Sequence, residues 1–542
     1  MTAKDDNTKR ECRVLISGAG PVGLALAIEL GRRNIDCVLV EKRDGSVSVP
    51  KMSAVSARNM EFCRRWGIAE RVRNAVWSEN NSLDFVYLTT MRGRELARMK
   101  VPSHSDRGSL SYTPEGGCHC PQIYFDPILT EYAQGLSSVE IRYRTELSSF
   151  TQSAEKVVAT LKDGESGETE TIEADYLVGC DGAGGVVREV LGIGLGGRGV
   201  VAQSLNIFFR SPELSALHDK GWARFYRAIG HEGCWSELIA IDGRELWRLT
   251  VFDSERTPGT AEDLLRRVVG CDFPFEIISA SPWERRDVVA DGFGGGRAFL
   301  AGDAVHQCSP TGGLGMHTGI EDAVNIAWKL EAMIAGWGGS DLMASYEAER
   351  RPIGERNVEF ATRAFRQITG IPGGDALADD TSAGDSQRAA LAEATADLRR
   401  YSVSEIDKAQ YCYENSPICV PDGATPPPAA PPGKYVPSAR PGTRAPHAWI
   451  SDGVSTLDLF GDGFVLLDLS GGPGDVESLA DAMAARNVPF RVECVADPDT
   501  ARAYERRFVL VRPDGHVAWR GDDIPADPGS VVDTVRGALS AR

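Results

Sequence analysis

A glycine-rich turn near the start of the chain constrains the fold more than any other feature. The motif Gly18-x-Gly20-x-x-Gly23 follows an apolar segment at 13–17, and a helical pattern at 24–33 and a second apolar segment at 36–41 come after it. This order predicts a βαβ unit. The three glycines permit a tight turn, a close approach of the backbone to a pyrophosphate, and packing of the helix on the strand. Glu41 ends the second strand, where a carboxylate can bind ribose hydroxyls. The segment predicts a dinucleotide site and, alone, fits NAD and FAD equally.

Size and charge limit the possible partners. The 542 residues suggest roughly three to four domains at ~150 residues each. A net charge of -18 repels phosphate backbones and anionic membrane surfaces, so we expect neither nucleic acid nor membrane as a partner. No apolar run is long enough to span a bilayer and residues 1–6 are polar, which predicts a cytoplasmic protein. The 12 cysteines include no C-x-x-C pair, so we predict a reducing compartment and no metal site.

Two later segments decide between the cofactors. One predicted strand runs into Cys180-Asp181-Gly182-Ala183, and another ends at Gly302-Asp303-Ala304-x-His306, before Pro310-x-Gly-Gly-x-Gly315 opens a helix. Together with the first glycine motif, they resemble the single-component FAD-dependent aromatic hydroxylases, the class A flavoprotein monooxygenases. The match extends to 56–61, 121–126 and 346–352. Residues 441–447 and 511–520 are similar to the thioredoxin-like domain of the phenol hydroxylase, dichlorophenol hydroxylase and polyketide hydroxylase branch.

The resemblance implies an α/β protein of three domains. A Rossmann-like FAD-binding domain would comprise 1–185 and 285–415, with 80–110 belonging to the substrate domain. A β-sheet substrate domain would be inserted at 186–284, where aromatic residues alternate between 204 and 252 and predict the wall of a substrate cavity. Ten prolines mark 416–446 as a linker to a thioredoxin-like domain at 447–542 that lacks C-x-x-C. We expect 371–400, rich in Ala, Asp and Ser, to form an irregular excursion.

The resemblance also implies which residues bind FAD. Arg58 and Gln122 would hold phosphate and ribityl groups, Asp181 would lie on the pyridine-nucleotide side, and Asp303 would bind a ribityl or ribose hydroxyl. Backbone N–H groups at a helix N-terminus would stabilise negative charge on the reduced ring. Where the family usually has Asn, this chain has His317, which we expect to contact the flavin. The complete predicted cofactor set is Gly18, Gly20, Gly23, Glu41, Arg58, Gln122, Asp181, Asp303, Pro310, Gly313, Leu314, Gly315 and His317.

The reaction implied is the hydroxylation of a phenolic or heteroaromatic molecule, in catabolism or natural-product biosynthesis. NADH or NADPH would reduce FAD, O2 would add at flavin C4a, and the resulting hydroperoxide would transfer its distal oxygen to the ring. A base must reach the substrate hydroxyl, and the sequence does not identify it, because Ser53 stands where some phenol hydroxylases carry an acid. Arg224 and Tyr226, on the predicted cavity sheet, are candidates for holding an anionic or phenolic group, although buried packing with a rim arginine explains them equally well.

Other functions fit the same residues. Baeyer–Villiger oxygen insertion or epoxidation would use the same cofactor contacts, whereas the Trp-x-Trp-x-Ile-Pro signature of tryptophan-type halogenases is absent. A non-catalytic flavin-binding or interaction protein would use its C-terminal domain, in which Cys494 has no partner cysteine for dithiol exchange. An NAD-dependent dehydrogenase would leave the Gly-Asp and Pro-x-Gly-Gly segments unexplained. We expect at least a homodimer.

Overall fold

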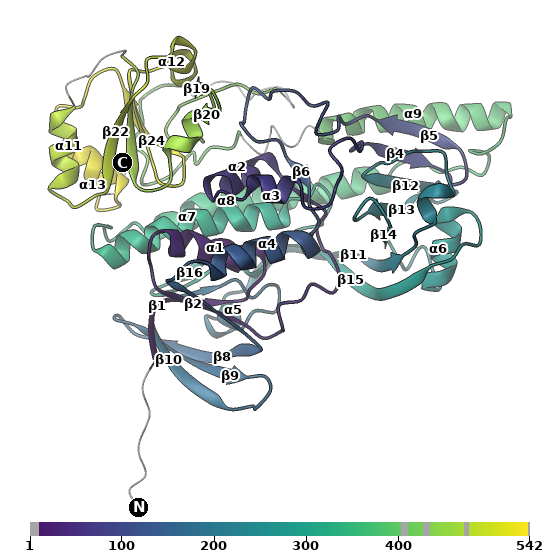
Figure 1. The fold of residues 1–542 in the computed structure, drawn as a ribbon, viewed down its shortest axis with the longest axis horizontal. Coiled ribbons are helices and arrows are strands. Elements are labelled where there is room, and N and C mark those ends of the chain that lie inside the picture. Colours follow the sequence, from purple (N-terminus) through teal and green to yellow (C-terminus); the bar gives the residue numbers. More distant parts are fainter. Residues whose placement is uncertain (1–9, 403–409, 426–433, 471–475, 540–542) are drawn as a thin grey trace, which may run out of the picture.

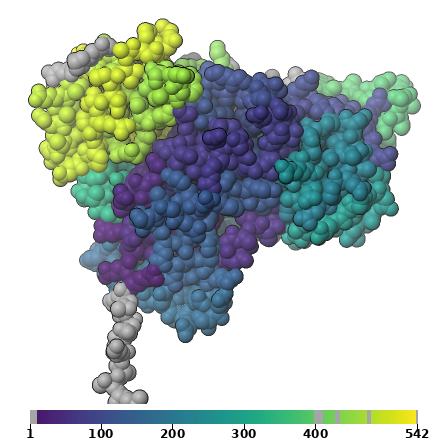
Figure 2. All heavy atoms as spheres, in the orientation of Figure 1, coloured from purple at the N-terminus to yellow at the C-terminus, as the bar shows by residue number. Residues whose placement is uncertain are grey.

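The computed structural model describes residues 10–402, 410–425, 434–470 and 476–539. Three units, each built on a sheet, follow one another across the molecule (Figure 1). Figure 2 shows the C-terminal unit in yellow and most of the large eight-stranded sheet in teal at opposite ends of a purple and blue body. The polar residues 1–6, and Pro426, Pro427, Pro428, Pro431 and Pro432 of the proline-rich stretch, lie outside the described residues. Within the described residues, no helix is both long and apolar enough to cross a membrane.

The first unit is built on five parallel strands in the order β17-β10-β1-β2-β7. Val14, Leu15 and Ile16 of the central strand are completely buried, because both faces of the sheet are covered. Helices stack on one side of the sheet and the β8–β9 hairpin lies on the other (Figure 1). The strands are β1 (Arg10–Ser17), β2 (Cys37–Glu41), β7 (Val139–Tyr143), β8 (Thr145–Gln152), β9 (Val157–Asp163), β10 (Thr169–Gly179), β16 (Gly294–Gly295) and β17 (Ala298–Leu300).

The helices of this unit come from widely separated parts of the chain. Gly31 allows α1 to lie against the start of β7, since a side chain there would be 2.5 Å from Val139. A two-stranded ladder of β3 (Ala54–Val55) and β6 (Cys118–His119) precedes α2 and α4. The helices are α1 (Pro21–Arg32), α2 (Ala57–Arg65), α3 (Ala69–Arg73), α4 (Gln122–Gln134), α5 (Val186–Val190), η2 (Gly302–Ala304), α7 (Gly315–Ala335) and α8 (Ala344–Thr369).

The second unit is an eight-stranded sheet in the order β18-β15-β11-β14-β13-β12-β4-β5. Helix α6 (Ala261–Val269) buries Leu264, Leu265, Val268 and Val269 against one face of it. Strands β4 and β5 come from the 80–110 segment and join this sheet through β12. Its strands are β4 (Phe85–Leu88), β5 (Glu95–Met99), β11 (Leu195–Arg210), β12 (Phe225–Gly230), β13 (Gly233–Ala240), β14 (Leu246–Val251), β15 (Glu276–Ala290) and β18 (His306–Gln307); η1 (Leu214–Ala216) follows β11.

The C-terminal unit contains a four-stranded sheet in the order β22-β21-β23-β24, with only the β21–β22 pair parallel. Helix α11 connects the parallel pair, and α11 and α13 pack on this sheet with Phe464 and Leu510. A short β19–β20 hairpin precedes it. The elements are β19 (Trp449–Ser451), β20 (Val454–Ser455), η3 (Thr456–Leu459), β21 (Phe464–Asp468), α11 (Glu477–Ala484), β22 (Phe490–Cys494), α12 (Pro498–Tyr504), β23 (Phe508–Val511), β24 (Val517–Gly521) and α13 (Pro528–Val535).

The 371–400 segment and the described parts of the proline-rich stretch are more ordered than the sequence predicts. The prediction of an irregular excursion at 371–400 is wrong over most of its length, because α9 (Ser382–Ser402) is a regular helix that buries Leu391. Alanine, the strongest helix former, accounts for this. In the proline-rich stretch, Ile418 and Ala439 are completely buried, and Val420 N–H donates to the carbonyl of Ala518 over 2.8 Å. The described parts of this stretch are therefore packed segments and not a free tether.

Candidate active site

The carboxyl ends of four parallel strands meet at one edge of the first sheet. Ser17 at the end of β1 is in register with Gly179 of β10 and with Val40 of β2, and Gly179 is in register with Leu300 of β17. Each strand runs into one of the predicted segments, namely the 18–23 turn, Glu41, Asp181 and the Gly302-Asp303 turn. The edge of a parallel sheet outside the strand carboxyl ends is where α/β proteins bind ligands. The structure thus brings these sequence-distant segments together.

The first glycine turn leaves space where a phosphate would lie. Gly18 has φ +102°, and a side chain there would be 2.5 Å from the carbonyl oxygen of Cys180. A side chain at Gly23 would collide with the carbonyl oxygen of Gly18. By contrast, no heavy atom lies within 4 Å of where the Cβ of residue 20 would be, and no side chain caps α1, which begins at Pro21. The open, positive N-terminus of α1 fits an anionic pyrophosphate.

Three carboxylates lie around this edge, and they have different bonding partners. Glu41 accepts hydrogen bonds from the N–H groups of Ala19 (3.0 Å) and Arg43 (2.9 Å), so it fixes the glycine turn. Asp181 accepts from the Ser17 hydroxyl (3.4 Å) and Val187 N–H (3.3 Å) through one oxygen. Its other oxygen is buried and bonded to none of the described residues.

Asp303 lies in the Gly302-Asp303 turn at the end of β17. Its side chain is exposed, yet burial among surrounding protein atoms raises its pKa, as it does for Asp181. We interpret this combination as a carboxyl group in an open recess. Both groups have acceptor capacity that a chain of hydroxyl groups would satisfy, as in the ribityl chain of FAD.

The N-terminus of α7 lies beside these turns. Leu314 precedes its first residue, Gly315, and Gly313 has φ +61° with open space where a Cβ would be. Gly313 N–H donates to the carbonyl of Pro310 over 2.9 Å, which closes the turn. Further along the helix, a side chain at Gly319 would be 2.6 Å from Val22 and 3.0 Å from the Cα of Gly302. Glycine at 319 therefore lets α7 bring its positive N-terminus to the same edge as that of α1.

Two more predicted cofactor residues flank this edge. Gln122 begins α4, where its amide donates to Asp126 over 2.9 Å and accepts from Lys51 N–H over 3.2 Å. His317 Nε2 lies 3.1 Å from both the Ser56 N–H and the Ala54 carbonyl, so it connects α7 to the β3–α2 segment. Both residues have protein partners here, and their contact with flavin stays a prediction.

Arg58 does not join this edge. Its guanidinium forms an ion pair with Glu61 at 2.8 Å and donates to the carbonyl of Asp514 over 3.1 Å, on the side of the C-terminal unit. Glu61 is also paired with Arg444. This carboxylate is buried three residues further along the same helix, where it balances the charge of Arg58. A contact of Arg58 with FAD stays a prediction.

A row of polar side chains crosses the large sheet on the face that turns toward the first unit. The row follows the strand register from Asn206 through Thr250, Glu237 and Arg227 to Tyr87. Thr250 donates to Asn206 (2.7 Å), and Arg227 donates to Glu237 (2.7 Å) and to the Tyr87 hydroxyl (2.8 Å). The next row along the strands is mainly apolar, with Phe208, Ile239 and Phe225, and it packs on Ile123 and Tyr124 of α4. This polar row was not predicted, because it exists only across five strands.

The sheet candidates Arg224 and Tyr226 do not belong to this row. Tyr226 is completely buried on the opposite face, where its hydroxyl donates to the Gly221 carbonyl (2.5 Å) and accepts from Ala223 N–H (2.8 Å). Arg224 precedes the first residue of β12, and its guanidinium lies 4.8 Å from the Phe225 ring centroid. Because side chains alternate along a strand, Tyr226 and Arg227 lie on opposite faces of the sheet, and a role of Arg224 or Tyr226 in substrate binding stays a prediction. Arg227 is the β12 arginine on the face toward the first unit.

Two further arginines on this side of the sheet are buried and form no ion pair among the described residues, although the charge of Glu237 acts on both. Arg248, in register with Phe208 and Ile239, donates to the Pro50 carbonyl, and its Nε is buried without a partner among those residues. Arg285 donates to Ser204 (2.7 Å) and Ser309 (3.0 Å), beside the Pro310 turn. Burial lowers the pKa of Arg248 to about 10 and that of Arg285 to about 9, so both stay charged at neutral pH. This part of the structure is electrostatically suited to an anion.

A buried group that was not singled out in the sequence holds the Gly302-Asp303 turn. Asp322 of α7 accepts from Gly302 N–H (3.1 Å) and from His306 Nε2 (2.7 Å), and its second oxygen accepts from Arg350 Nε (2.7 Å). Asp322 and Arg350 are both completely buried. They lie in segments that carry the family resemblance, so a search of those segments for charged residues at helical spacing would have found them.

Comparisons with known proteins agree with this geometry. A family model described as an FAD-binding domain matches residues 11–361, and one for the C-terminal region of aromatic-ring hydroxylases matches 438–541. A putative polyketide hydroxylase of Streptomyces halstedii is 33% identical over 97% of both chains. The solved structure of RebC with bound 7-carboxy-K252c, soaked with chromopyrrolic acid, superposes with a TM-score of 0.91 at 40% identity, over 98% of this chain and 100% of RebC. The flavin-dependent monooxygenase PieE, in complex with FAD and substrate, superposes with a TM-score of 0.89 at 30% identity, over 97% of this chain and 99% of PieE.

Proposed function

This chain belongs to the family of FAD-dependent aromatic-ring hydroxylases, and we propose that it transfers one oxygen atom from O2 to an acidic aromatic molecule. Family membership confirms the predicted fold class, the FAD cofactor and the monooxygenase activity. The acidic substrate and the role of each residue are our proposals. Arg248 is the observation that supports them most directly, because its buried guanidinium forms no ion pair with a described carboxylate and its Nε has no hydrogen-bond partner among those residues, while the charge of Glu237 acts on it only from a distance.

The residues at the sheet edge fit FAD. The N-terminus of α1 and the open side of Gly20 would hold the pyrophosphate, and Asp181 and Asp303 would accept hydrogen bonds from hydroxyl groups. The N-terminus of α7 at Gly313, Leu314 and Gly315 would lie against the ring, where its N–H groups favour the negative charge of the reduced form. When bound, FAD accepts a hydride from NADH or NADPH and supplies the oxygen chemistry that amino-acid side chains lack.

The polar row would orient the aromatic substrate between the sheet and the flavin. Asn206 uses its carbonyl oxygen to accept from Thr250, which leaves its amide N–H groups able to donate. Glu237 uses one carboxylate oxygen for Arg227, which leaves the other able to accept the proton of a substrate hydroxyl. Phe208, Ile239 and Phe225 would contact the ring from the apolar row and keep water away from it.

Arg248 would bind an acidic group of the substrate. Glu237 offsets the cost of burying this cation only in part, and a bound carboxylate in direct contact would offset more of it while fixing the orientation of the ring. Chromopyrrolic acid and 7-carboxy-K252c, the compounds in the RebC structure, are carboxylic acids by name. The polyketide hydroxylase of Streptomyces halstedii indicates that substrates of relatives are natural-product intermediates. We therefore place the reaction in natural-product biosynthesis.

A substrate panel tests this function. The FAD-loaded protein is given NADH or NADPH and pairs of aromatic compounds, each pair consisting of a carboxylic acid and its amide. We expect the acids to stimulate nicotinamide oxidation more strongly, and mass spectrometry under isotopically labelled O2 to show one incorporated oxygen. NMR of the product distinguishes ring hydroxylation from oxygen insertion next to a ketone. Equal stimulation by acids and amides would contradict the role of Arg248, and no oxygenated product from any aromatic compound would contradict ring hydroxylation.

A further inference from the structure

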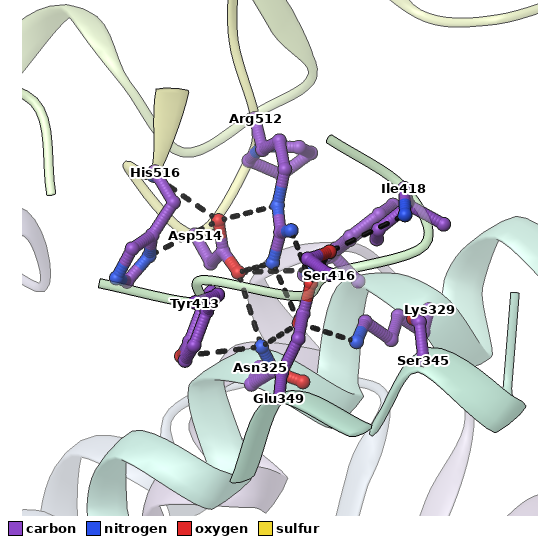
Figure 3. Close-up of polar contacts among 12 residues, drawn as sticks. Asn325, Lys329, Ser345, Glu349, Tyr413, Ser416, Ile418, Arg512, Asp514 and His516 are labelled. Atoms are coloured by element: carbon purple, nitrogen blue, oxygen red, sulfur yellow. Dashed lines mark hydrogen bonds and ion pairs between the residues drawn. The ribbon is translucent and has the colours of Figure 1, made fainter. Parts of the chain in front are cut away.

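The turn between β23 and β24 inserts two charged side chains into the surface of α7 and α8. Arg512 and Asp514 from this turn and Glu349 from α8 are all buried, and Arg512 binds both carboxylates at 2.5 Å (Figure 3). Lys329 of α7 binds Glu349 from the other side at 2.8 Å. Asn325, one helical turn earlier, donates to Glu349 (2.8 Å) and Asp514 (3.3 Å). Two cations and two anions are thus balanced through direct contacts.

The buried charges favour one position of the C-terminal unit on α7 and α8. Although burial alone would raise the pKa of Glu349, Arg512 and Lys329 hold it down to about 2. Burial lowers the pKa of Lys329 to about 8, even beside Glu349. A buried charge that loses its partner is strongly destabilising, so a shifted docking of the C-terminal unit is disfavoured. The cluster therefore specifies the position of this unit on α7 and α8 more than it adds to the strength of the contact.

The cluster continues toward the cofactor edge through side chains that are all buried. Asn325 lies 3.4 Å from the Tyr413 hydroxyl, which accepts from Arg350 Nη1 over 3.1 Å. Arg350 in turn binds Asp322 and donates to the carbonyl of Thr318 in the first turn of α7 over 3.1 Å. Asp322 holds the N–H of Gly302. A chain of polar contacts, in which the 3.4 Å approach of Asn325 to Tyr413 is the longest link, thus runs from the C-terminal turn at Asp514 to the turn that carries Asp303.

We propose that the C-terminal unit is a positioning element of the FAD site. It would act by fixing Arg350 and Asp322, which hold the Gly302-Asp303 turn and the first turn of α7. The proposal rests on the placement of FAD at this edge under the proposed function, and it gives the 512–516 turn a role apart from dithiol chemistry. Asp514, Tyr413, Arg350 and Asp322 are positioning residues, because none of them reaches the reacting atoms.

A double-mutant cycle on FAD affinity tests the connection. Asp514→Asn keeps the shape of the side chain but removes its charge, and we expect the FAD dissociation constant to rise about tenfold. In an Arg350→Met background, the same substitution should have little further effect, since the chain is already broken. Equal effects of Asp514→Asn in both backgrounds would overturn the proposal. Asp499→Asn, at an exposed ion pair of the same unit, is the matched control and should leave FAD affinity unchanged.

Hydrogen exchange separates positioning from general stability. In Asp514→Asn we expect faster exchange of the Gly302 amide, which donates to Asp322, while amides of β1 exchange as before. If Asp514→Asn does not fold, Tyr413→Phe removes a single hydroxyl group and should raise the FAD dissociation constant by a smaller factor. If a folded variant shows unchanged FAD affinity and unchanged exchange of the Gly302 amide, the proposal is overturned. The C-terminal unit would then pack on α7 and α8 without influencing the FAD site. These measurements use no substrate, so their failure is distinct from a failure of the substrate panel.

Discussion

The cofactor edge and the polar face of the large sheet are built in different ways. The edge depends on backbone, with glycines at 18, 20, 23, 313 and 319 where a side chain would clash or fill needed space. The sheet face depends on side chains from five strands that meet only through register. A requirement on backbone leaves a local signal in the sequence, whereas a surface assembled across strands leaves none. The comparison predicts that substitutions at the cofactor edge lower the stability of the fold and the affinity for FAD. Substitutions on the polar face of the large sheet should instead change which substrates are turned over.

The largest expected effect is the difference in stability between alanine substitutions at two glycines of the cofactor edge, Gly23 and Gly20. Gly23→Ala places a methyl group into the carbonyl of Gly18, and we expect about 3 kcal/mol of lost stability with loss of FAD. Gly20→Ala meets no protein atom within 4 Å, so the folded apoprotein should keep its melting temperature and lose only FAD affinity. Thermal unfolding and FAD titration of both variants measure this. Equal destabilisation by the two would contradict the assigned phosphate space.

On the sheet face, Arg248→Met should change substrate choice and spare the cofactor. We expect kcat/KM for an aromatic acid to fall about 100-fold, because the carboxylate loses its buried cation, with little change for the matching amide. FAD affinity should stay as in the parent protein. Tyr226→Phe, on the opposite face of the sheet, is the control and should leave kcat/KM unchanged for both the acid and the amide. A parallel loss for acid and amide would mean that Arg248 supports the sheet and not the substrate.

The same contrast explains what could be predicted from the sequence. The Gly18 and Gly302-Asp303 segments were found because each is a short run with a backbone requirement, and the parallel register then placed them together. The contact of Arg58 with the carbonyl of Asp514 was not visible in the sequence, because the two residues are 456 positions apart. Tyr226 was assigned to the cavity because alternation predicts two faces but does not say which one turns toward the first unit. Arg248 became visible only through its buried neighbours.

Within the edge, the removal of one carboxylate should have a smaller effect. Asp303→Ala should weaken FAD binding by about 2 kcal/mol, or about thirtyfold in the dissociation constant, by removing an acceptor for a cofactor hydroxyl. Cys494→Ala changes an exposed thiol of the C-terminal unit and should leave retention unaltered. FAD release during gel filtration, followed by absorbance, compares the two. Equal retention by both variants would count against Asp303 as a cofactor contact.

The smallest expected effect is a pH dependence of stability caused by Asp126. This residue lies in α4, the helix that packs on the apolar row of the large sheet. It binds Gln122 in the first turn of α4, next to Ile123 and Tyr124, which pack on the sheet. Burial raises the pKa of Asp126 from 3.8 to about 7, so between these values the folded chain keeps a proton that the unfolded chain has released. Its contribution to stability therefore falls as pH rises through this window and is lost above pH 7.

From pH 6 to pH 8 this loss is about 1.4 kcal/mol, and Asp126→Asn should remove it. The sheet-face charges do not titrate there, because the pKa values of Arg248 and Arg285 stay at about 10 and about 9. Chemical denaturation at pH 6 and pH 8 measures the slope, with the exposed Asp499→Asn as control. An unchanged slope in Asp126→Asn would place the titrating group elsewhere. A flattened slope would assign the loss of stability at higher pH to Asp126, which Gln122 binds in the first turn of α4.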